Sequence, residues 1–251
     1  MKKQHPLGLV SISFRPHSPE DILDAMKRAG LTHIEWGSDV HAPAKDLARV
    51  KAIAELTKAS GMTVSSYGTY FRLGVTPLSE LPDYIAAAKL LGTDILRLWC
   101  GSKSGESMTD AEREALIEEC RAAARMAEMT EVVLCMECHR ATFTERTEDS
   151  LYLMQAVSSP AFRMYYQPHQ WKTVEENLRM AKALAPYTEV IHVFEWKGSD
   201  RFPLSDGIEV WRTYLSAFDG QPLLLEFMPD DRIESLCAEA DALRRIVGGE
   251  A

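Results

Sequence analysis

Four short apolar runs in the second half of the chain each carry, at or near their end, a polar side chain that can bind a metal. The four residues are Glu137, Gln167, His192 and Glu226, and the runs are VVLCMECH, FRMYYQPH, EVIHVFEW and PLLLEF. Isolated polar groups are costly at the end of a buried strand unless something pairs with them. Four of them at roughly regular intervals therefore indicate one shared partner, and a divalent metal fits these groups.

The parity of each run indicates which side chains share a face. Side chains alternate across a strand, so Glu137 and His139 are expected on one face and Cys138 on the other. By the same rule Gln167 shares a face with His169, while His192 and Glu226 share faces with apolar neighbours in their own runs. Glu137 and Glu226 are then expected to point to the same interior side of the sheet as His192.

Blander interpretations differ in strength from residue to residue. A lone histidine in an apolar strand, such as His192, is more often a hydrogen-bonded core residue than a ligand. Carboxylates are almost never fully buried without a partner, so Glu137 and Glu226 favour a site. Gln167 is uninformative alone and gains its meaning from its place in the series.

The segment CMECH also matches the C-x-x-C-H pattern of c-type haem attachment. That attachment needs export, which the first residues, MKKQHPLGLVSISFRP, do not indicate. A strand would also send Cys135 and Cys138 to opposite faces. Neither a haem nor a zinc-thiolate site is therefore expected here.

The elements that must position these residues alternate in a regular way. Eight apolar runs, separated by amphipathic stretches, are LGLVSIS, THIEW, TVSSYGTYF, DILRLWC, EVVLCMEC, FRMYYQP, EVIHVFEW and PLLLEF. Eight strand-then-helix units in 251 residues predict an α/β fold, a (β/α)8 TIM barrel forming a single domain over residues 1–251. An open doubly wound sheet is the competitor, but the turn after the first run has no glycine-rich phosphate loop.

Start and stop signals support the helices. Ser18, Thr109 and Asp206 are expected N-caps, and Gly61 and Gly92 are expected to end helices. Barrel active sites lie at the carboxyl ends of the strands, where all four candidate ligands are found.

Charge and cysteine content restrict the function classes. The 28 basic and 37 acidic residues give a net charge of -9, which disfavours nucleic acid and anionic membranes as partners. No segment approaches a membrane span. Five cysteines without an export signal favour reduced thiols and a cytoplasmic location.

The order of ligand types resembles a known group. Glu137, then Gln167 with x-His, then His192 and Glu226 resemble the xylose-isomerase-like barrel superfamily, specifically its sugar isomerase and epimerase branch related to tagatose 3-epimerase. The similarity covers essentially the whole chain, with supporting stretches IEWGSDVH, ECH, QPHQ, HVFEW and RFPLSDGIEVW.

The resemblance implies a role for individual residues. Glu137, His192 and Glu226 would ligate one divalent metal, with Gln167 where relatives commonly carry Asp. His169 and Arg201 match residues that reach substrate. The uncharged Gln167 leaves the two carboxylates and the ion neutral together, which is expected to weaken binding and raise Lewis acidity. The sequence does not choose among Mn²⁺, Mg²⁺, Co²⁺ and Zn²⁺.

The implied chemistry is isomerisation or epimerisation of a sugar or keto-polyol through an enediolate. Glu137 and Glu226 would be the catalytic acid and base on opposite sides of the substrate. Asp230 and Asp231 after the last strand favour an unphosphorylated, uncharged substrate. Two alternatives stay open: a metal-dependent lyase or dehydratase on a keto-polyol, and a non-catalytic sugar-binding barrel. An apurinic endonuclease is disfavoured, because the expected additional histidines are missing.

Further substrate contacts are weaker expectations that surface ion pairs or packing would explain as well. Trp36 and Trp196 are additional stacking surfaces. The resemblance also allows a homodimer or homotetramer with a small-molecule sugar as partner. The remaining expected substrate contacts are His139, Glu35, His41, Arg97 and Trp99.

Overall fold

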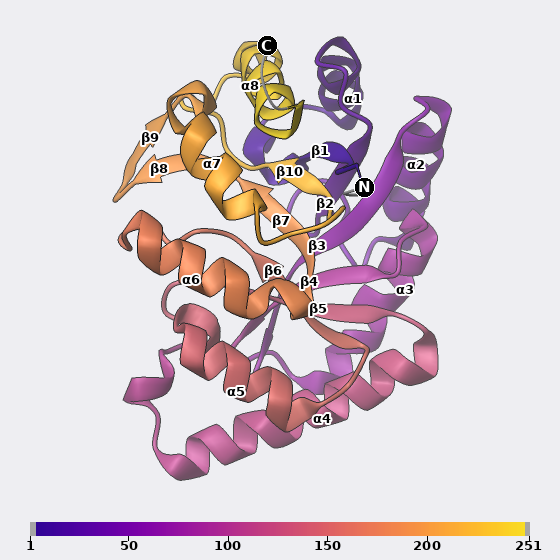
Figure 1. Ribbon diagram of the computed structural model, residues 1–251. Coiled ribbons are helices and arrows are strands. Elements are labelled where there is room, and N and C mark those ends of the chain that lie inside the picture. Colours follow the sequence, from indigo (N-terminus) through magenta and orange to yellow (C-terminus); the bar gives the residue numbers. More distant parts are fainter. Residues whose placement is uncertain (1–3, 249–251) are drawn as a thin grey trace.

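The computed structural model describes residues 4–248 and confirms the barrel. Within these residues eight parallel strands close on themselves in the order β1-β10-β7-β6-β5-β4-β3-β2 (Figure 1). The strands are β1 (Leu7–Val10), β2 (His33–Gly37), β3 (Thr63–Leu73), β4 (Ile95–Cys100), β5 (Val133–Glu137), β6 (Phe162–Tyr166), β7 (Thr188–Val193) and β10 (Leu223–Leu225). Each contains part of one of the eight predicted apolar runs.

Strand parity separates two apolar regions. In β5, Leu134 and Met136 belong to the large core between the strands and the helices, while Cys135 belongs to a small cluster. This small cluster contains side chains from several strands and fills the barrel interior. Its buried members are Val10, Ile12, Cys135, Tyr165, Val190 and Leu224. The inward parity expected for the β5 run is therefore confirmed, and Cys138 lies in the outer core.

Eight helices lie outside the strands in the described part of the chain (Figure 1). They are α1 (Pro19–Arg28), α2 (Leu47–Ala59), α3 (Leu81–Leu91), α4 (Asp110–Thr130), α5 (Thr147–Val157), α6 (Val174–Leu184), α7 (Ile208–Leu215) and α8 (Leu236–Gly248).

The predicted helix signals are mostly confirmed. Ser18 accepts from the Asp21 amide, and Thr109 forms a capping box with Glu112. Gly92 follows α3 with a φ of 83°, which suits glycine. The expectation for Asp206 is wrong, because this residue lies in the 3-10 helix Leu204–Gly207 and α7 begins after Gly207 without a side-chain cap.

The run EVIHVFEW is not one strand as expected. Strand β7 ends at Val193, which pairs with Leu225, the last residue of its neighbour β10. Glu195–Lys197 (β8) then pairs in antiparallel fashion with Asp200–Phe202 (β9). This hairpin follows the carboxyl end of β7, next to the site described below.

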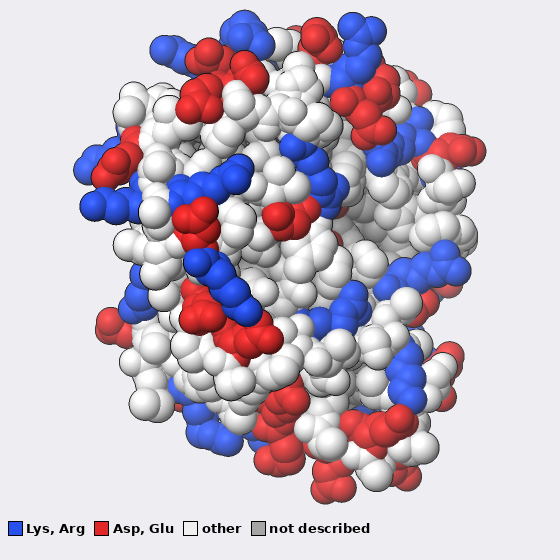
Figure 2. Space-filling model, turned by 180° about the vertical axis from the view of Figure 1, so that it is seen from behind, with Lys and Arg blue, Asp and Glu red and all other residues white. Residues whose placement is uncertain are grey.

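Two observations concern the partners that the sequence disfavours. None of the helices within residues 4–248 is both long and apolar enough to span a bilayer. On the face shown in Figure 2, acidic and basic side chains are interspersed rather than gathered into a basic stripe.

Candidate metal centre

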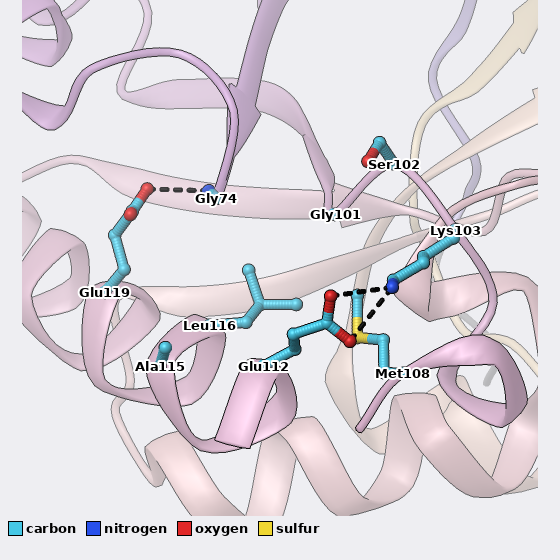
Figure 3. Close-up of a pocket in the computed structure, with 9 residues that line it drawn as sticks. All are labelled: Gly74, Gly101, Ser102, Lys103, Met108, Glu112, Ala115, Leu116 and Glu119. Atoms are coloured by element: carbon cyan, nitrogen blue, oxygen red, sulfur yellow. Dashed lines mark hydrogen bonds and ion pairs between the residues drawn. The ribbon is translucent and has the colours of Figure 1, made fainter. Parts of the chain in front are cut away.

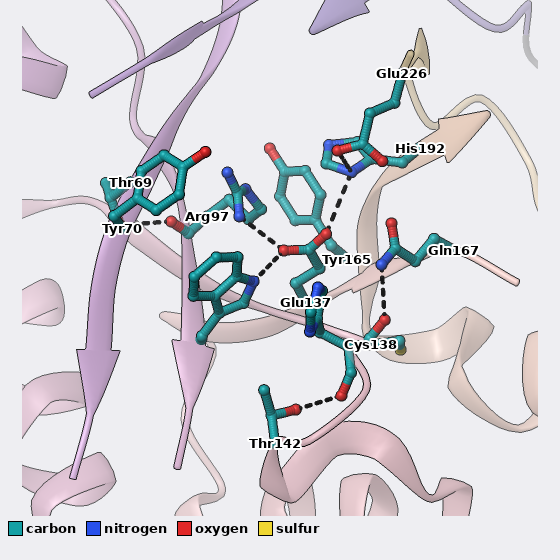
Figure 4. Close-up of polar contacts among 12 residues, drawn as sticks. Thr69, Tyr70, Arg97, Glu137, Cys138, Thr142, Tyr165, Gln167, His192 and Glu226 are labelled. Carbon is teal, nitrogen blue, oxygen red and sulfur yellow. Dashed lines mark hydrogen bonds and ion pairs between the residues drawn. The ribbon is translucent and has the colours of Figure 1, made fainter. Parts of the chain in front are cut away.

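Three of the predicted ligands converge at the carboxyl end of the barrel. His192 Nδ1 lies 3.5 Å from Glu226 Oε1 and 3.6 Å from Glu137 Oε1. One ligand atom from each residue can be chosen so that all lie within 4.8 Å of one another, and all three residues are buried. Figure 4 shows the imidazole of His192 next to both carboxylates.

The strand ends explain this convergence. Glu137 is the last residue of β5, and His192 lies in β7 opposite Leu224 of β10. Glu226 follows β10 directly, and its amide donates to the Val193 carbonyl at 3.0 Å. Parallel strands bring their carboxyl ends to one edge of the barrel, so residues far apart in sequence meet there.

Gln167 supplies a fourth donor atom. Its Nε2 donates to the Cys138 carbonyl at 2.9 Å, which fixes the amide so that Oε1 is the free end. Figure 4 shows this oxygen on the side turned toward His192 and Glu226. Gln167 directly follows β6, so the four residues come from the strands β5, β6, β7 and β10.

Two of these atoms are buried without a hydrogen-bond partner in the described chain. They are Gln167 Oε1 and His192 Nδ1. Unpaired buried polar atoms are rare and costly, and both of these can coordinate a cation. The donor set of two carboxylates, one amide oxygen and one imidazole nitrogen therefore fits a divalent metal.

A hydrogen-bonded layer lies directly below the cluster. Glu35 Oε2 is 3.4 Å from His192 Nε2 and accepts from Tyr165 at 2.9 Å and from Ser66 at 3.0 Å. Arg97 bridges this layer to the site: its Nε lies 3.3 Å from Glu35 and its Nη1 lies 2.7 Å from Glu137. All of these side chains are buried.

Gly68 makes room for this layer. A Cβ atom at this position would lie 2.3 Å from Glu35 Oε1 and 3.2 Å from Arg97 Nη2. Any larger residue in the middle of β3 would displace the buried ion pair.

The buried charges do not balance on their own. Glu35, Glu137 and Glu226 oppose a single guanidinium, that of Arg97, in the fully buried set. With His192 neutral, as a metal ligand must be, these four ionised groups sum to a charge of about -2; the protonated His192 of the metal-free protein reduces this to about -1. Uncompensated buried charge is strongly unfavourable. A divalent cation would neutralise the set.

The surroundings shift the pKa values of Glu137 and Glu226 in opposite directions. Burial raises the pKa of Glu137, but the charges of Arg97 and His192 outweigh it and hold the pKa well below its usual range. Burial raises the pKa of Glu226, and the attraction of His192 does not cancel this. Glu137 is thus held as an anion, while Glu226 holds a proton more readily.

A cavity of about 330 Å³ opens above the cluster. Glu137, Gln167 and Glu226 lie in its wall, with aromatic side chains around them. Its lining residues are Ile12, Arg15, Tyr70, Arg97, Trp99, Glu137, His139, Gln167, Gln170, Phe194, Trp196, Glu226 and Phe227. This volume suits a small ligand of sugar size.

Three of the expected substrate contacts line this cavity. Trp99 donates its indole N–H to Glu137 Oε2, and its ring lies 5.1 Å from that of His139. His139 Nδ1 lies 2.7 Å from the Arg140 carbonyl, to which it donates a hydrogen bond, and this contact orients the ring. Arg97 also lines the cavity, although its guanidinium is already ion-paired with Glu35 and Glu137.

Two other expected contacts lie below or beside the cavity. Glu35 is fully buried and its oxygens are occupied by the layer described above. His41 is buried between Ser11 Oγ, at 3.0 Å, and the His17 carbonyl, at 3.3 Å. Neither lines the cavity, so the sequence-based placement of both at the substrate is corrected.

His169 and Arg201 lie outside the cavity as well. His169 borders a neighbouring cavity of about 160 Å³, and burial lowers its pKa to about 4. Arg201 stacks on Trp196 and Phe227 and pairs with Asp231. The resemblance implied that both residues contact substrate, but neither of them lines this cavity. Of the two further tryptophans, Trp196 lines the cavity, whereas Trp36 is buried and donates to Thr57.

Sequence reasoning missed six lining residues: Ile12, Arg15, Tyr70, Gln170, Phe194 and Phe227. Arg15 follows the 3-10 helix Ser11–Phe14 at the end of β1, and Tyr70 lies in the long strand β3. Their proximity to strand ends is the signal that was available, because the loops after barrel strands form the active-site face.

A separate cavity of about 290 Å³ lies between the ends of β3 and β4 and helix α4 (Figure 3). Glu119 accepts from the Gly74 amide and Lys103 pairs with Glu112. The charged side chains drawn there are thus each paired within this cavity, in contrast to the unpaired atoms of the metal centre.

Several solved structures share this fold. The probable 3-DHS dehydratase AsbF from Bacillus anthracis, described as involved in petrobactin synthesis, is 17% identical with a TM-score of 0.78, covering 97% of this chain and 98% of that chain. A xylose isomerase-like TIM barrel protein from Mycobacterium smegmatis in complex with magnesium is 14% identical with a TM-score of 0.73, covering 98% of each chain. An L-ribulose 3-epimerase is 14% identical with a TM-score of 0.70, covering 96% of this chain and 93% of that chain.

These identities show a shared fold and leave the activity open. No curated protein matches the sequence. The sequence matches the family described as "Xylose isomerase-like TIM barrel" over residues 23–246. The chain therefore belongs to the xylose isomerase-like TIM barrel family.

Proposed function

We propose that the protein is a divalent-metal-dependent enzyme that isomerises or epimerises a sugar or keto-polyol through an enediolate. The observation that carries this proposal is a cluster of four buried donor residues, three of them in the cavity wall. Two of their donor atoms, Gln167 Oε1 and His192 Nδ1, have no hydrogen-bond partner among residues 4–248. The shared fold of an L-ribulose 3-epimerase and of a magnesium-bound barrel supports it.

Glu137, Gln167, His192 and Glu226 would hold the ion. Once bound, a divalent ion supplies Lewis acidity that polarises a substrate carbonyl and makes the neighbouring C–H more acidic. Glu35 holds the His192 ring from the far side, and Cys138 holds the amide of Gln167. Trp99 and Phe194 exclude water and offer stacking surfaces in the cavity.

Proton transfer is assigned to side chains with free lone pairs. Glu226 has no fixed donor among the described residues except the long contact with His192, so it can take a proton from substrate. His139 also lines the cavity, and because its Nδ1 donates to the Arg140 carbonyl, Nε2 is the ring nitrogen that would accept a proton from substrate. Positioned bases of this kind contribute about 10²–10⁴-fold to the rate.

One observation favours a second candidate, a lyase or dehydratase acting on a keto-polyol. Glu137 Oε2 already accepts from both Arg97 and Trp99, which leaves it poorly suited to exchange protons. Epimerisation needs a base on each face, which without Glu137 requires both Glu226 and His139, whereas elimination can begin from Glu226 alone. The shared fold of a probable 3-DHS dehydratase agrees with this candidate.

The two candidates differ in their products. The Mn²⁺-loaded protein is incubated in D₂O with ketoses and with keto-inositols. Deuterium at the carbon next to the carbonyl with a changed sugar ratio supports the isomerase or epimerase. A new enone absorbance supports the lyase, and sugar binding without any deuterium incorporation would leave only a binding protein.

The remaining assignments belong to the same proposal. The substrate is a small molecule of carbohydrate metabolism and the protein acts in the cytoplasm. Nucleic acid is not a partner, since a net charge of -9 and an interspersed surface offer no phosphate-binding stripe on the face in Figure 2. A homodimer or homotetramer remains compatible with this function.

A further inference from the structure

The cavity wall has two chemically different sides. Strands β5, β6, β7 and β10 bring the metal-binding groups, whereas Arg15 and Tyr70 come from the ends of β1 and β3. In the barrel order, β1 and β3 flank β2, which stands four strands away from β6 in either direction. Arg15 and Tyr70 therefore lie across the barrel mouth from Gln167.

Arg15 is held in place with donors to spare. Its Nε donates to Asp39 Oδ2 at 2.6 Å, its Nη1 to the Ile12 carbonyl at 3.3 Å, and its Nη2 to the Tyr70 hydroxyl. A guanidinium has five N–H groups, and these contacts use three of them. One N–H remains on each terminal nitrogen.

Tyr70 adds a third donor. Its oxygen accepts from Arg15, and its own hydrogen has no acceptor among residues 4–248. The ring is fixed by an edge contact with Trp99 at 5.3 Å and lies 5.9 Å from the Arg97 guanidinium. Two N–H groups and one O–H group thus remain available on one side of the cavity.

Donors without acceptors suit a ligand that carries only acceptors. A carboxylate has this property, and the planar fork of arginine matches its two oxygens. The two acidic side chains that line the cavity, Glu137 and Glu226, lie on the metal-binding side. The anion would therefore occupy the end of the substrate remote from the metal.

The sequence argument for an uncharged substrate does not hold in the structure. Asp230 accepts from Ser235 at 2.8 Å and from the Arg232 amide at 3.1 Å, while Asp231 pairs with Arg201. Neither aspartate lines the cavity. The two acids therefore do not face the substrate.

We infer that the Arg15–Tyr70 pair is a subsite for a carboxylate, and that the substrate is a keto sugar acid. This inference rests on the proposed function for the metal end of the cavity. Asp39 balances the charge of Arg15, so the subsite offers hydrogen-bond donors without a net positive charge. A phosphate dianion, with two negative charges to compensate, therefore suits it less well than a carboxylate with one.

Matched sugars separate these possibilities. D-Fructose, D-fructuronate and D-fructose 6-phosphate differ only in the group at carbon 6, and D-tagatose with D-tagaturonate forms a second pair. Binding of each to the Mn²⁺-loaded protein is measured by calorimetry. We expect at least one uronate to bind about tenfold or more tightly than its neutral partner, as a charge-assisted hydrogen bond predicts.

Variants test the residues. Arg15→Gln should remove the preference for the uronate, and Tyr70→Phe should reduce it by about threefold to tenfold. Arg15→Lys keeps the charge but loses the fork, and should restore only part of the preference. Arg201→Gln is the matched control, since Arg201 is also ion-paired near the mouth but lies off the cavity. It should leave the preference unchanged.

The outcomes have separate meanings. Equal or tighter binding of both neutral sugars overturns the carboxylate subsite and leaves the proposed function standing. Tightest binding of the 6-phosphate, or a uronate preference that survives Arg15→Gln in a protein with unchanged thermal unfolding, also overturns it. Binding of no sugar and no uronate contradicts the subsite and the proposed function together.

Discussion

Glu35 holds His192 from the side opposite the candidate metal. Glu35 Oε2 lies 3.4 Å from His192 Nε2, while His192 Nδ1 faces Glu137 and Glu226. Histidine ligands commonly place their second nitrogen against a carboxylate, which fixes the ring and raises its basicity. The arrangement indicates that Glu35, first considered a substrate contact, acts by positioning a ligand.

Replacing Glu35 should therefore weaken metal binding. We expect Glu35→Gln to lower Mn²⁺ affinity about 10–100-fold in a calorimetric titration. Glu239→Gln is the control, because Glu239 is also buried but accepts only from the Leu204 amide near α8. Equal Mn²⁺ affinities for Glu35→Gln and the parent protein would contradict the positioning role.

The two ligand glutamates should differ in their effect on stability. Glu137→Gln breaks the buried pair with Arg97 and is expected to cost about 3 kcal/mol in the free energy of unfolding of the metal-free protein. Glu226→Gln removes like-charge repulsion and should cost less than about 1 kcal/mol.

Urea unfolding in the presence of a chelator measures this difference in stability between the two variants. Both variants should also lower turnover by about 10²-fold or more. Full turnover in either variant would remove that residue from the chemistry. A Glu226→Gln protein as destabilised as Glu137→Gln would show that the asymmetry of the two environments is wrong.

Metal binding should release a proton. Burial lowers the pKa of His192, but the charges of Glu226 and Glu35 outweigh it and raise the pKa to about 10 in the metal-free protein. A ligating imidazole must be neutral, so Mn²⁺ binding at pH 7 to 8 should displace about one proton. Titrations in buffers of different ionisation enthalpy count these protons, and a count near zero would tell against ligation by His192.

The same group sets a pH dependence of stability. The folded pKa of about 10 lies above the ordinary value of 6.5, so the charged imidazole stabilises the metal-free fold most fully below pH 6.5. This contribution is lost as the pH rises from 6.5 through about 10. Chelator-treated protein should therefore lose stability over this range more steeply than a His192→Gln variant does.

Gln167 should contribute a neutral ligand. Gln167→Ala is expected to weaken Mn²⁺ binding about tenfold, because it removes the unpaired Oε1 from the cluster. Gln170→Ala, from the same loop and the same cavity, should leave the affinity within about twofold. Equal losses in the two variants would indicate a general disturbance of the loop.

The strands and most helix starts were predictable because they depend on local patterns. Apolar runs of strand length predict the strands, and the caps Ser18 and Thr109 predict where two helices begin. The β8–β9 hairpin was not predicted, because EVIHVFEW is one apolar run, whereas in the barrel β7 ends where its neighbour β10 ends and a new pairing begins at Glu195. That is a property of the closed barrel.

The metal ligands were found because carboxylates at the ends of apolar strands are unusual. The layer below them was missed for a different reason. Parity places Glu35 in HIEWG and Arg97 in ILRLWC on the inward faces of their strands, but it does not say how deep each side chain lies. Burial beneath the cavity depends on partners from distant strands, such as Tyr165, and on the space left by Gly68.

An anomalous-scattering map of crystals grown with Mn²⁺ tests the central claim most directly. It should show one strong peak bound by Glu137, Gln167, His192 and Glu226 at about 2.0–2.4 Å from each donor atom. Crystals with abundant manganese but no peak there, or with Glu137 and Glu226 turned away from each other, would contradict the metal centre and the chemistry assigned to it.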